Sequence, residues 1–328
     1  MTRALRLVRR RLLSAIPVLA IVVIGAFLLL ELAPGDAVDA YIVSTGGGDA
    51  QMIAELRNAW GLDQSAGARL GAYLAALARG DLGWSVSFSR PILDVILERL
   101  PNTLLLMASA TALSFALGSL LGIVAGARPG SFRDRFLSIG SLALYAIPGF
   151  WLGLVLVIVF SISLRWLPLA GIETIASGKH GLARALDIAA HLVLPVSSLG
   201  IIYLALYLRM MRAGMAEVWR LDFVRAAEAR GIPRRRIVIR HVARNALMPL
   251  VTMLGLQSAS MLGGSVVIES VFAIPGLGRL ASEAVASRDT PLLLGIVLVS
   301  AVLVILINLA VDIAYALLDP RVGATEPS

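Results

Sequence analysis

The residue types that most often carry out chemistry are scarce or widely separated in this chain. Cysteine is absent, which excludes disulfides, thiolate nucleophiles, iron–sulfur clusters and Cys-ligated zinc. The three histidines, His180, His191 and His241, stand far apart in the sequence. The stretch nearest to a phosphate-binding loop, Ser177–His180, lacks the upstream glycine and the following Ser or Thr. We therefore expect no catalytic residue, no cofactor and no metal in this chain, so any ATP chemistry belongs to a partner.

One segment, residues 221–236, has a pattern that is unusual for a connecting loop. It reads Leu-Asp-Phe-Val-Arg-Ala-Ala-Glu-Ala-Arg-Gly-Ile-Pro-Arg-Arg-Arg. Asp222 can act as the N-cap of a helix, Gly231 suits the left-handed position after a helix, and Pro233 prevents the helix from continuing. The pattern predicts a short helix with a fixed start and a fixed end. A basic helix over 235–247 is expected to follow it.

The composition of this short helix suits insertion into a groove on another protein. Ala226, Ala227 and Ala229 keep the helix thin, so a second surface can approach it closely. Phe223 and Val224 offer an apolar anchor, as in other helix-in-groove contacts. The alternative is an ordinary structured loop whose charges only orient the chain in a membrane.

The elements that position these residues are apolar. Hydrophobic residues make up 58% and charged residues 15% of the 328 residues, against about 45–50% and about 25% in soluble domains. Six uncharged blocks are each long enough to cross a hydrocarbon layer about 30 Å thick. They are Leu12–Leu30, Leu100–Ala127, Phe136–Leu164, Ile188–Leu208, Asn245–Ile268 and Thr290–Val311. The sequence predicts an all-α polytopic membrane protein with six transmembrane helices, the first a retained span and not a cleaved signal peptide.

The distribution of charge orients these six helices. With both termini cytoplasmic, the inside segments hold 19 of the 29 Lys and Arg, although the outside segments are longer. Such an excess of basic residues in short loops is typical of the cytoplasmic side. The basic residues therefore lie beside membrane lipid, and a nucleic-acid partner is not expected.

The chain is expected to divide near residue 100. Residues 1–100 combine the first span with a periplasmic segment, in which apolar periodicity predicts helices over Met52–Trp60 and about Ala66–Ala78. We expect these helices to form a small cap on the membrane surface, with a plain connector as the alternative. Residues 101–328 would form a five-span core, with a cytoplasmic loop at 209–245.

Several stretches along the chain resemble one family of membrane proteins. Residues 222–231 are similar to the EAA loop of ABC-importer permeases, in the form found in the dipeptide/oligopeptide/nickel branch, and Arg244–Pro249 fits the end of that motif. Arg225 stands where the broader motif has glutamate, which narrows the subfamily. Further matching stretches, in the order of the first permease subunit of that branch, lie at 32–36, 79–85, 98–103, 147–153, 269–278 and 318–321.

This resemblance implies a type I ABC-importer permease fold in the bacterial inner membrane, and it implies partners. A second, homologous permease would complete a heterodimer, two ATPase subunits would bind ATP and Mg²⁺, and an extracytoplasmic solute-binding protein would deliver the cargo. In such assemblies the loop helix sits in a cleft on the ATPase. The matching contact positions here are Asp222, Phe223, Ala226, Ala227 and Gly231.

Other residues are candidates for the translocation pathway or its gate. Two of them interrupt the third apolar block, where a proline kink is tolerated if the helix faces protein or water. Four follow the fifth block, where a turn with a short helix or re-entrant segment is expected at the outer mouth. The candidates are Pro148, Gly149, Glu269, Pro275, Gly276 and Gly278.

Cargo and energy source leave alternatives open. The resemblance favours peptides, but nickel, glutathione and oligosaccharides use similar permeases. An ion-coupled secondary transporter is the alternative from another class, and it would need embedded ionisable groups and repeated halves. Glu31 and Asp312 are the two acids at or inside the spans, and we expect them to have interfacial or structural roles, not roles in a proton relay. An intramembrane enzyme is disfavoured because no catalytic constellation is present.

Overall fold

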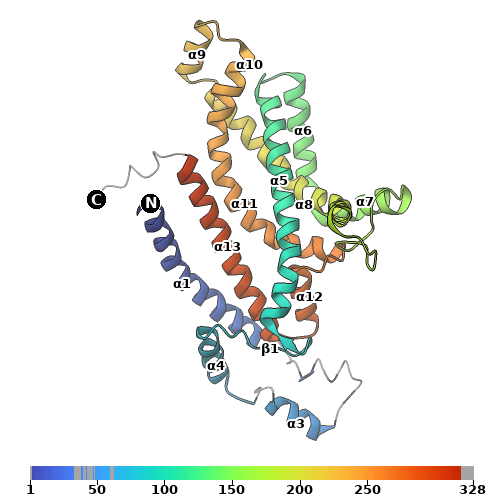
Figure 1. Ribbon diagram of the computed structural model, residues 1–328. Helices are drawn as coiled ribbons and strands as arrows, with labels where there is room; N and C mark the ends of the chain where they lie inside the picture. Colours follow the sequence, from blue (N-terminus) through green and yellow to red (C-terminus); the bar gives the residue numbers. More distant parts are fainter. Residues whose placement is uncertain are drawn as a thin grey trace. The chain divides into compact units, whose positions relative to one another are not determined.

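The computed structural model describes residues 2–32, 38, 39, 42, 47, 49–59 and 63–318 (Figure 1). These residues are mostly helical, with one antiparallel pair of short strands, β1 (Trp84–Ser85) and β2 (Arg90–Pro91). The chain forms two compact units, Met1–Pro101 with Gly276–Leu306, and Asn102–Pro275 with Ile307–Ser328. The first unit thus also takes in residues 276–306, which the division expected near residue 100 assigned to the core. The sequence matches at 33–36 and 319–321 lie outside the described residues.

Among the described residues, five helices are long and apolar enough to cross a membrane, or six if one bent pair counts as a single span. These helices contain five of the six predicted blocks, apart from Ala127, which follows the end of its helix. They are α1 (Thr2–Glu31), α5 (Ile92–Gly126), α8 (Gly181–Val218), the run of α10 (Arg234–Arg236), η2 (Ile237–Ala243) and α11 (Arg244–Val271), and α13 (Thr290–Leu318).

The basic helix predicted over 235–247 is not a separate element. Residues 234–271 run as one apolar helix, in which η2 is a turn of π-helix and Pro249 lies inside α11. A proline is tolerated inside a membrane helix where local π-helical geometry and neighbouring groups satisfy the freed backbone. The predicted end of the basic helix at residue 247 was therefore wrong.

The third predicted span is broken into two helices. Its first part is α6 (Phe132–Ala146), its second part is α7 (Gly149–Leu156) followed by η1 (Val157–Ser163), and the two parts are bent by 96°. Ile147 has ψ 125° because the following proline ring excludes the helical conformation, and Pro148 is also extended, with ψ 131°. Two successive extended residues turn the chain, so the predicted continuous span is corrected to a broken one.

Helix α8 is central to the second unit, where it packs against α6, α7 and α11. It also lies very close to α5, because three glycines spaced by four residues face it. The facing pairs are Gly118 and Tyr207, Gly122 and Met211, and Gly126 and Met215. A β-carbon on Gly122 would lie 2.5 Å from Cβ of Met211 and 2.8 Å from the carbonyl oxygen of Leu208. Small residues at this spacing let two membrane helices approach closely.

The first unit contains the two helices predicted for the periplasmic segment. They are α3 (Ala50–Ala59) and α4 (Ala66–Ala78). Arg69 of α4 forms an ion pair with Glu31 at the end of α1, which gives Glu31 a structural role. This pair and the contacts between α1 and α4 hold the second of these helices against the first span.

A buried aspartate joins the β-turn of the first unit to the start of α13. Asp289 accepts hydrogen bonds from the Ser85 hydroxyl at 2.6 Å and from the backbone N–H of Ser87 at 2.9 Å. Its other oxygen accepts from the backbone N–H of Leu292 at 3.2 Å, which caps α13. Residues 79–85, one of the stretches that resemble the permease family, thus have a structural role in the first unit.

Candidate functional site

Helix α9 (Asp222–Ala229) is the short helix that the sequence predicts, and it lies where α8 ends and α10 begins (Figure 1). Its N-cap is Leu221, which is extended and makes no side-chain cap. Asp222 is instead the first helical residue, so its predicted role as the N-cap was wrong by one position. Its carboxylate still lies at the positive end of the helix dipole and 3.8 Å from Arg225 Nη1.

The end of α9 has the geometry that the sequence predicts. Gly231 has φ +69°, its N–H donates to the Glu228 carbonyl at 2.9 Å, and the N–H of Ile232 donates to the Ala227 carbonyl at 3.2 Å. These two bonds form a Schellman motif, in which the left-handed residue is normally glycine. Pro233 then precedes α10, so the helix stops within one turn.

One face of α9 packs against another part of the same chain. Val224 and Ala227 are buried and pack in one cluster with Ile237 and Val238 of η2. Val224 is therefore not available as an anchor for a partner. Ala227 is 5% exposed, so it belongs to the buried face that holds the helix in place and not to the predicted contact surface.

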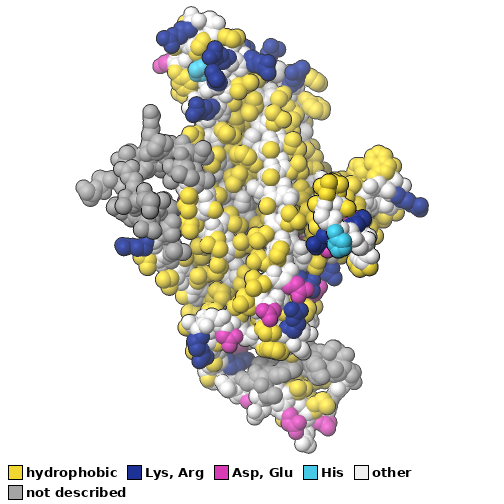
Figure 2. Space-filling model, in the orientation of Figure 1, with side chains coloured by type: hydrophobic (Ala, Val, Ile, Leu, Met, Phe, Trp, Pro, Cys, Tyr) yellow, Lys and Arg dark blue, Asp and Glu magenta, His cyan; other side chains and the backbone are white. Residues whose placement is uncertain are grey.

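The opposite face of α9 is open. Asp222, Phe223 and Ala226 are exposed, Phe223 to 42%, and Gly231 is exposed just beyond the helix. A bulky aromatic side chain beside a small one can insert into a groove on a partner protein and anchor the helix there. Lys and Arg side chains gather at this end of the unit (Figure 2), including the exposed Arg220, Arg225, Arg230, Arg234, Arg235 and Arg236.

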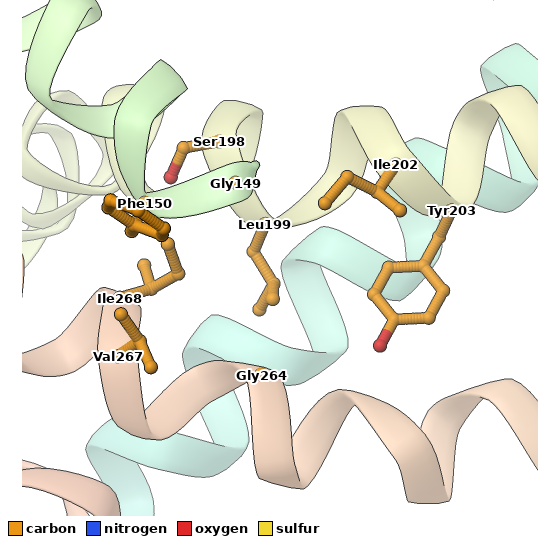
Figure 3. Close-up of a pocket in the computed structure, with 9 residues that line it drawn as sticks. All are labelled: Gly149, Phe150, Ser198, Leu199, Ile202, Tyr203, Gly264, Val267 and Ile268. Atoms are coloured by element: carbon orange, nitrogen blue, oxygen red, sulfur yellow. The ribbon is translucent and has the colours of Figure 1, made fainter. Parts of the chain in front are cut away.

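A second candidate site is an open pocket of about 200 Å³ at the break in the third span (Figure 3). It is lined by Gly149, Phe150, Ser198, Leu199, Ile202, Tyr203, Gly264, Val267 and Ile268, from α7, α8 and α11. The Ser198 hydroxyl donates to the Pro195 carbonyl at 3.1 Å, and Tyr203 brings a second hydroxyl. The lining carries no charged side chain, so the pocket is suited to an apolar group.

The pathway candidates differ in their surroundings. Gly149 lines the pocket, where a β-carbon would lie 3.2 Å from Cδ1 of Ile202, and Pro148 is exposed beside it. Glu269 is fully buried and accepts a hydrogen bond from the Thr103 hydroxyl at 2.7 Å. Glu269 therefore ties α11 to α5 in this structure and does not face an open path.

The remaining gate candidates surround a turn and a short helix. The Pro275 carbonyl accepts a hydrogen bond from the Asn102 side chain at 2.7 Å. Gly276 precedes the helix α12 (Leu277–Ala286), and Gly278 is buried inside it. The predicted short helix after the fifth span is therefore confirmed. Its first residue, Leu277, is buried in the first unit against residues such as Ile92, so it does not offer a surface for docking.

Sequence reasoning missed a buried ion pair between α6 and α8. Asp134 is 1% exposed and accepts hydrogen bonds from two nitrogens of Arg212, the Nη2–Oδ2 distance being 2.9 Å. It also accepts from the backbone N–H of Gly130 at 2.8 Å and from the Ser138 hydroxyl at 3.3 Å. The signal that could have found it is the single acid in residues 128–135, where the other charged residues are all arginines.

A second missed network fastens the loop after η1 to the start of α8. Asp187 accepts from the backbone N–H of Thr174 at 2.7 Å and from Lys179 Nζ at 2.5 Å. Arg184 makes two hydrogen bonds to Glu173, and this guanidinium holds the pKa of the Glu173 carboxyl below its usual value. Within the described part of the chain, His, Asp and Glu form no group of three that could hold a metal ion.

The chain is similar in sequence to components of bacterial transport systems. Residues 118–324 match the family described as binding-protein-dependent transport system inner membrane component. The di/tripeptide transport system permease protein DppB of Pseudomonas aeruginosa is 37% identical, over 97% of this chain and 98% of that protein. The oligopeptide transport system permease protein AppB of Bacillus subtilis is 36% identical, over 95% of this chain and 98% of that protein.

A solved structure shares the fold. A chain of the methionine ABC transporter MetNI, in an inward-facing conformation, has a TM-score of 0.56 and 18% identity, over 69% of this chain and 97% of that chain. At this identity the likeness concerns the fold alone. The region matched by the family begins inside α5 and includes both α9 and the pocket.

Proposed function

The chain belongs to the family of binding-protein-dependent transport system inner membrane components, and from this premise we propose that it is a permease subunit of an ATP-driven peptide importer. It is a polytopic helical protein of the bacterial inner membrane. The observation that carries the peptide assignment is the similarity, along nearly the whole chain, to two permeases named for di/tripeptide and oligopeptide transport.

The exposed face of α9 is the surface proposed to receive the ATPase. This face belongs to a short helix whose other face is buried against η2. Its shape is therefore fixed before a partner binds. Phe223 would fill a groove on the ATPase, Ala226 would allow close approach, and Asp222 and Gly231 would border the contact. Arg220, Arg225 and Arg230, which lie in α9 or directly beside it in the sequence, favour a groove with acidic groups at its rim.

The proposed assembly contains further subunits. A second, homologous permease would complete the pathway, two ATPase subunits would bind ATP and Mg²⁺ and hydrolyse the ATP, and a solute-binding protein would deliver the cargo. This chain would contribute no catalytic group and no cofactor site. Support for this division comes from the family description, which names an inner membrane component of a system that depends on a binding protein.

Ala226→Arg is expected to reduce ATP-dependent uptake at least about tenfold, because a long charged side chain would stand on the face that meets the ATPase. The measurement is uptake of labelled trialanine by proteoliposomes containing the complete complex, with recovery of the ATPase subunits on a tagged permease as a second readout. Glu228→Arg introduces the same side chain on the other side of α9 and is expected to retain uptake. Native uptake by Ala226→Arg, with the ATPase still bound, would contradict the contact.

The cargo is tested separately on the cognate solute-binding protein. Di- and tripeptides are expected to raise its melting temperature, whereas Ni²⁺ chelates, glutathione and oligosaccharides are expected to leave it unchanged. A shift with nickel alone would reassign the cargo without affecting the permease role. Uptake by this chain without ATPase subunits, driven by an ion gradient, would overturn the proposal in favour of a secondary transporter.

A further inference from the structure

Two side chains bind the C-terminal end of α5. Trp219 Nε1 donates a hydrogen bond to the Gly126 carbonyl at 2.8 Å, and Arg234 Nη2 donates to the Ala127 carbonyl at 3.1 Å. The last carbonyls of a helix have no partner within the helix, and they form the negative end of its dipole. An indole N–H and a guanidinium are therefore suited to this position.

The same two side chains also contact each other. The guanidinium carbon of Arg234 lies 5.2 Å from the centroid of the Trp219 ring, which is cation–π geometry. Trp219 directly follows α8, and Arg234 is the first residue of α10. They therefore flank α9 in the sequence, one before it and one after it, and both ends of the segment that carries α9 are attached to α5.

Helix α5 has no direct chain connection to α9, because about 95 residues separate the end of α5 from the start of α9. Its polar links at this end, among the described residues, are Trp219 and Arg234. Its other contacts here are apolar: its glycines pack closely on α8, and Ile123 packs against the cluster that contains Val224 and Ala227. The buried face formed by Val224 and Ala227 holds α9 to η2, on the α11 side. Without the two side chains, a displacement of α9 would reach α5 only through apolar packing, which has no fixed hydrogen-bond geometry.

We propose that Trp219 and Arg234 form a clamp that passes the displacement of α9 to α5. The clamp makes α9 and the C-terminal part of α5 move as one body. Trp219 and Arg234 are positioning residues in this role, since they touch neither the cargo nor the ATP. The proposal rests on the proposed function, because the displacement is supplied by the ATPase.

The test uses conservative variants that remove the bonds but keep most of the packing. Trp219→Phe retains an aromatic ring and loses the N–H donor, and Arg234→Gln retains a polar side chain and loses the guanidinium and its charge. Arg235→Gln changes the next residue of α10 in the same way, and that residue is exposed. The assembled complex is reconstituted in nanodiscs, because the chain acts only with its partners.

The chain has no native cysteine, so two spin labels can be placed without removing any residue of that type. The labelled variants are Glu228→Cys on α9 and Leu120→Cys on the exposed face of α5. Their distance is measured by pulsed electron resonance without nucleotide and with ATP and vanadate. In the otherwise native chain and in Arg235→Gln we expect the same distance in both states. In the Trp219→Phe/Arg234→Gln double variant we expect the distance to change between states.

Uptake per ATP hydrolysed is the second readout, with labelled trialanine as the cargo. Loss of one hydrogen bond between the clamp and α5 corresponds to about a fivefold change in the equilibrium between attached and detached α5. The double variant is therefore expected to transport at least about fivefold less cargo per ATP hydrolysed. A loss of folding alone would lower uptake and ATP hydrolysis together and leave their ratio unchanged. If the double variant is not recovered, Trp219→Phe alone is compared with the native chain in the same two assays.

The outcomes separate this proposal from the one on which it rests. A complex with the native chain that lacks ATP-dependent uptake would refute the proposed function. Where native uptake is present, the clamp is overturned if the native distance between α9 and α5 changes with nucleotide. It is also overturned if the variants keep both the native distances and the native ratio of uptake to ATP.

Discussion

Gly122→Ala is expected to destabilise the protein, whereas Gly140→Ala is expected to leave it unchanged or make it more stable. Both glycines lie inside helices, where alanine is favoured over glycine by about 1 kcal/mol. A β-carbon at Gly140 meets nothing within 4 Å, but one at Gly122 would lie 2.5 Å from Cβ of Met211. Overpacking of this kind costs about 1–3 kcal/mol, so the net sign is opposite at the two positions.

The expected difference grows with the size of the introduced side chain. Gly122→Leu should prevent α5 from packing on α8, and we expect no monodisperse protein in detergent, while Gly140→Leu is recovered normally. The measurement is thermal unfolding of the purified alanine variants in one detergent, with size-exclusion profiles for the leucine variants. Equal melting temperatures for Gly122→Ala and Gly140→Ala would show that α5 and α8 are not in contact at this position.

Asp134→Ala is expected to lower the free energy of unfolding by at least about 3 kcal/mol, because one partner of a buried ion pair is removed. The change also leaves the backbone N–H of Gly130 without its acceptor. Arg212→Ala should cost at least as much, because it leaves the buried Asp134 carboxylate without its countercharge, with only the hydrogen bonds from Gly130 and Ser138. Thermal unfolding of the two single variants and the double variant measures these effects.

A double-mutant cycle decides whether the two residues act as a pair. We expect the loss in Asp134→Ala/Arg212→Ala to be smaller than the sum of the two single losses, because no charge is left buried without its partner. Ser131→Ala, which removes the hydroxyl that caps α6, is a matched control in the same loop and should be additive with Arg212→Ala. Additivity of the Asp134 and Arg212 changes would refute the pairing.

The long helices could be predicted from the sequence because the signal is local. Each apolar block is long enough to cross a membrane, and five of the six blocks lie within single long helices, apart from Ala127 at the end of the second block. The two short helices α3 and α4 could also be predicted from their apolar periodicity. The break in the third span could be predicted only in part. The proline at position 148 showed that the helix is disturbed, but the bend of 96° depends on both Ile147 and Pro148 being extended in the folded chain.

For α9, too, the sequence predicts some features and tertiary packing decides the others. The end of α9 could be predicted because Gly231 and Pro233 restrict their own backbone, whereas the side of α9 that faces outward could not. Phe223 and Val224 are neighbouring apolar residues in the sequence, yet one is exposed and the other is buried. Packing against Ile237 and Val238 decides between them, and that contact forms only when the chain turns back at Gly231.

The sequence by itself determined that this is a polytopic membrane protein with a short, rigid helix in its most basic loop, and it pointed to the permease family. These properties depend on length, apolarity, charge and backbone preference, which act over a few neighbouring residues. Only the tertiary structure decided which side chains join the helices. Asp134 and Arg212 are 78 residues apart, Gly126 and Trp219 are 93 apart, and Thr103 and Glu269 are 166 apart. Such contacts depend on which helices come together and in what register, and no local pattern in the chain specifies that.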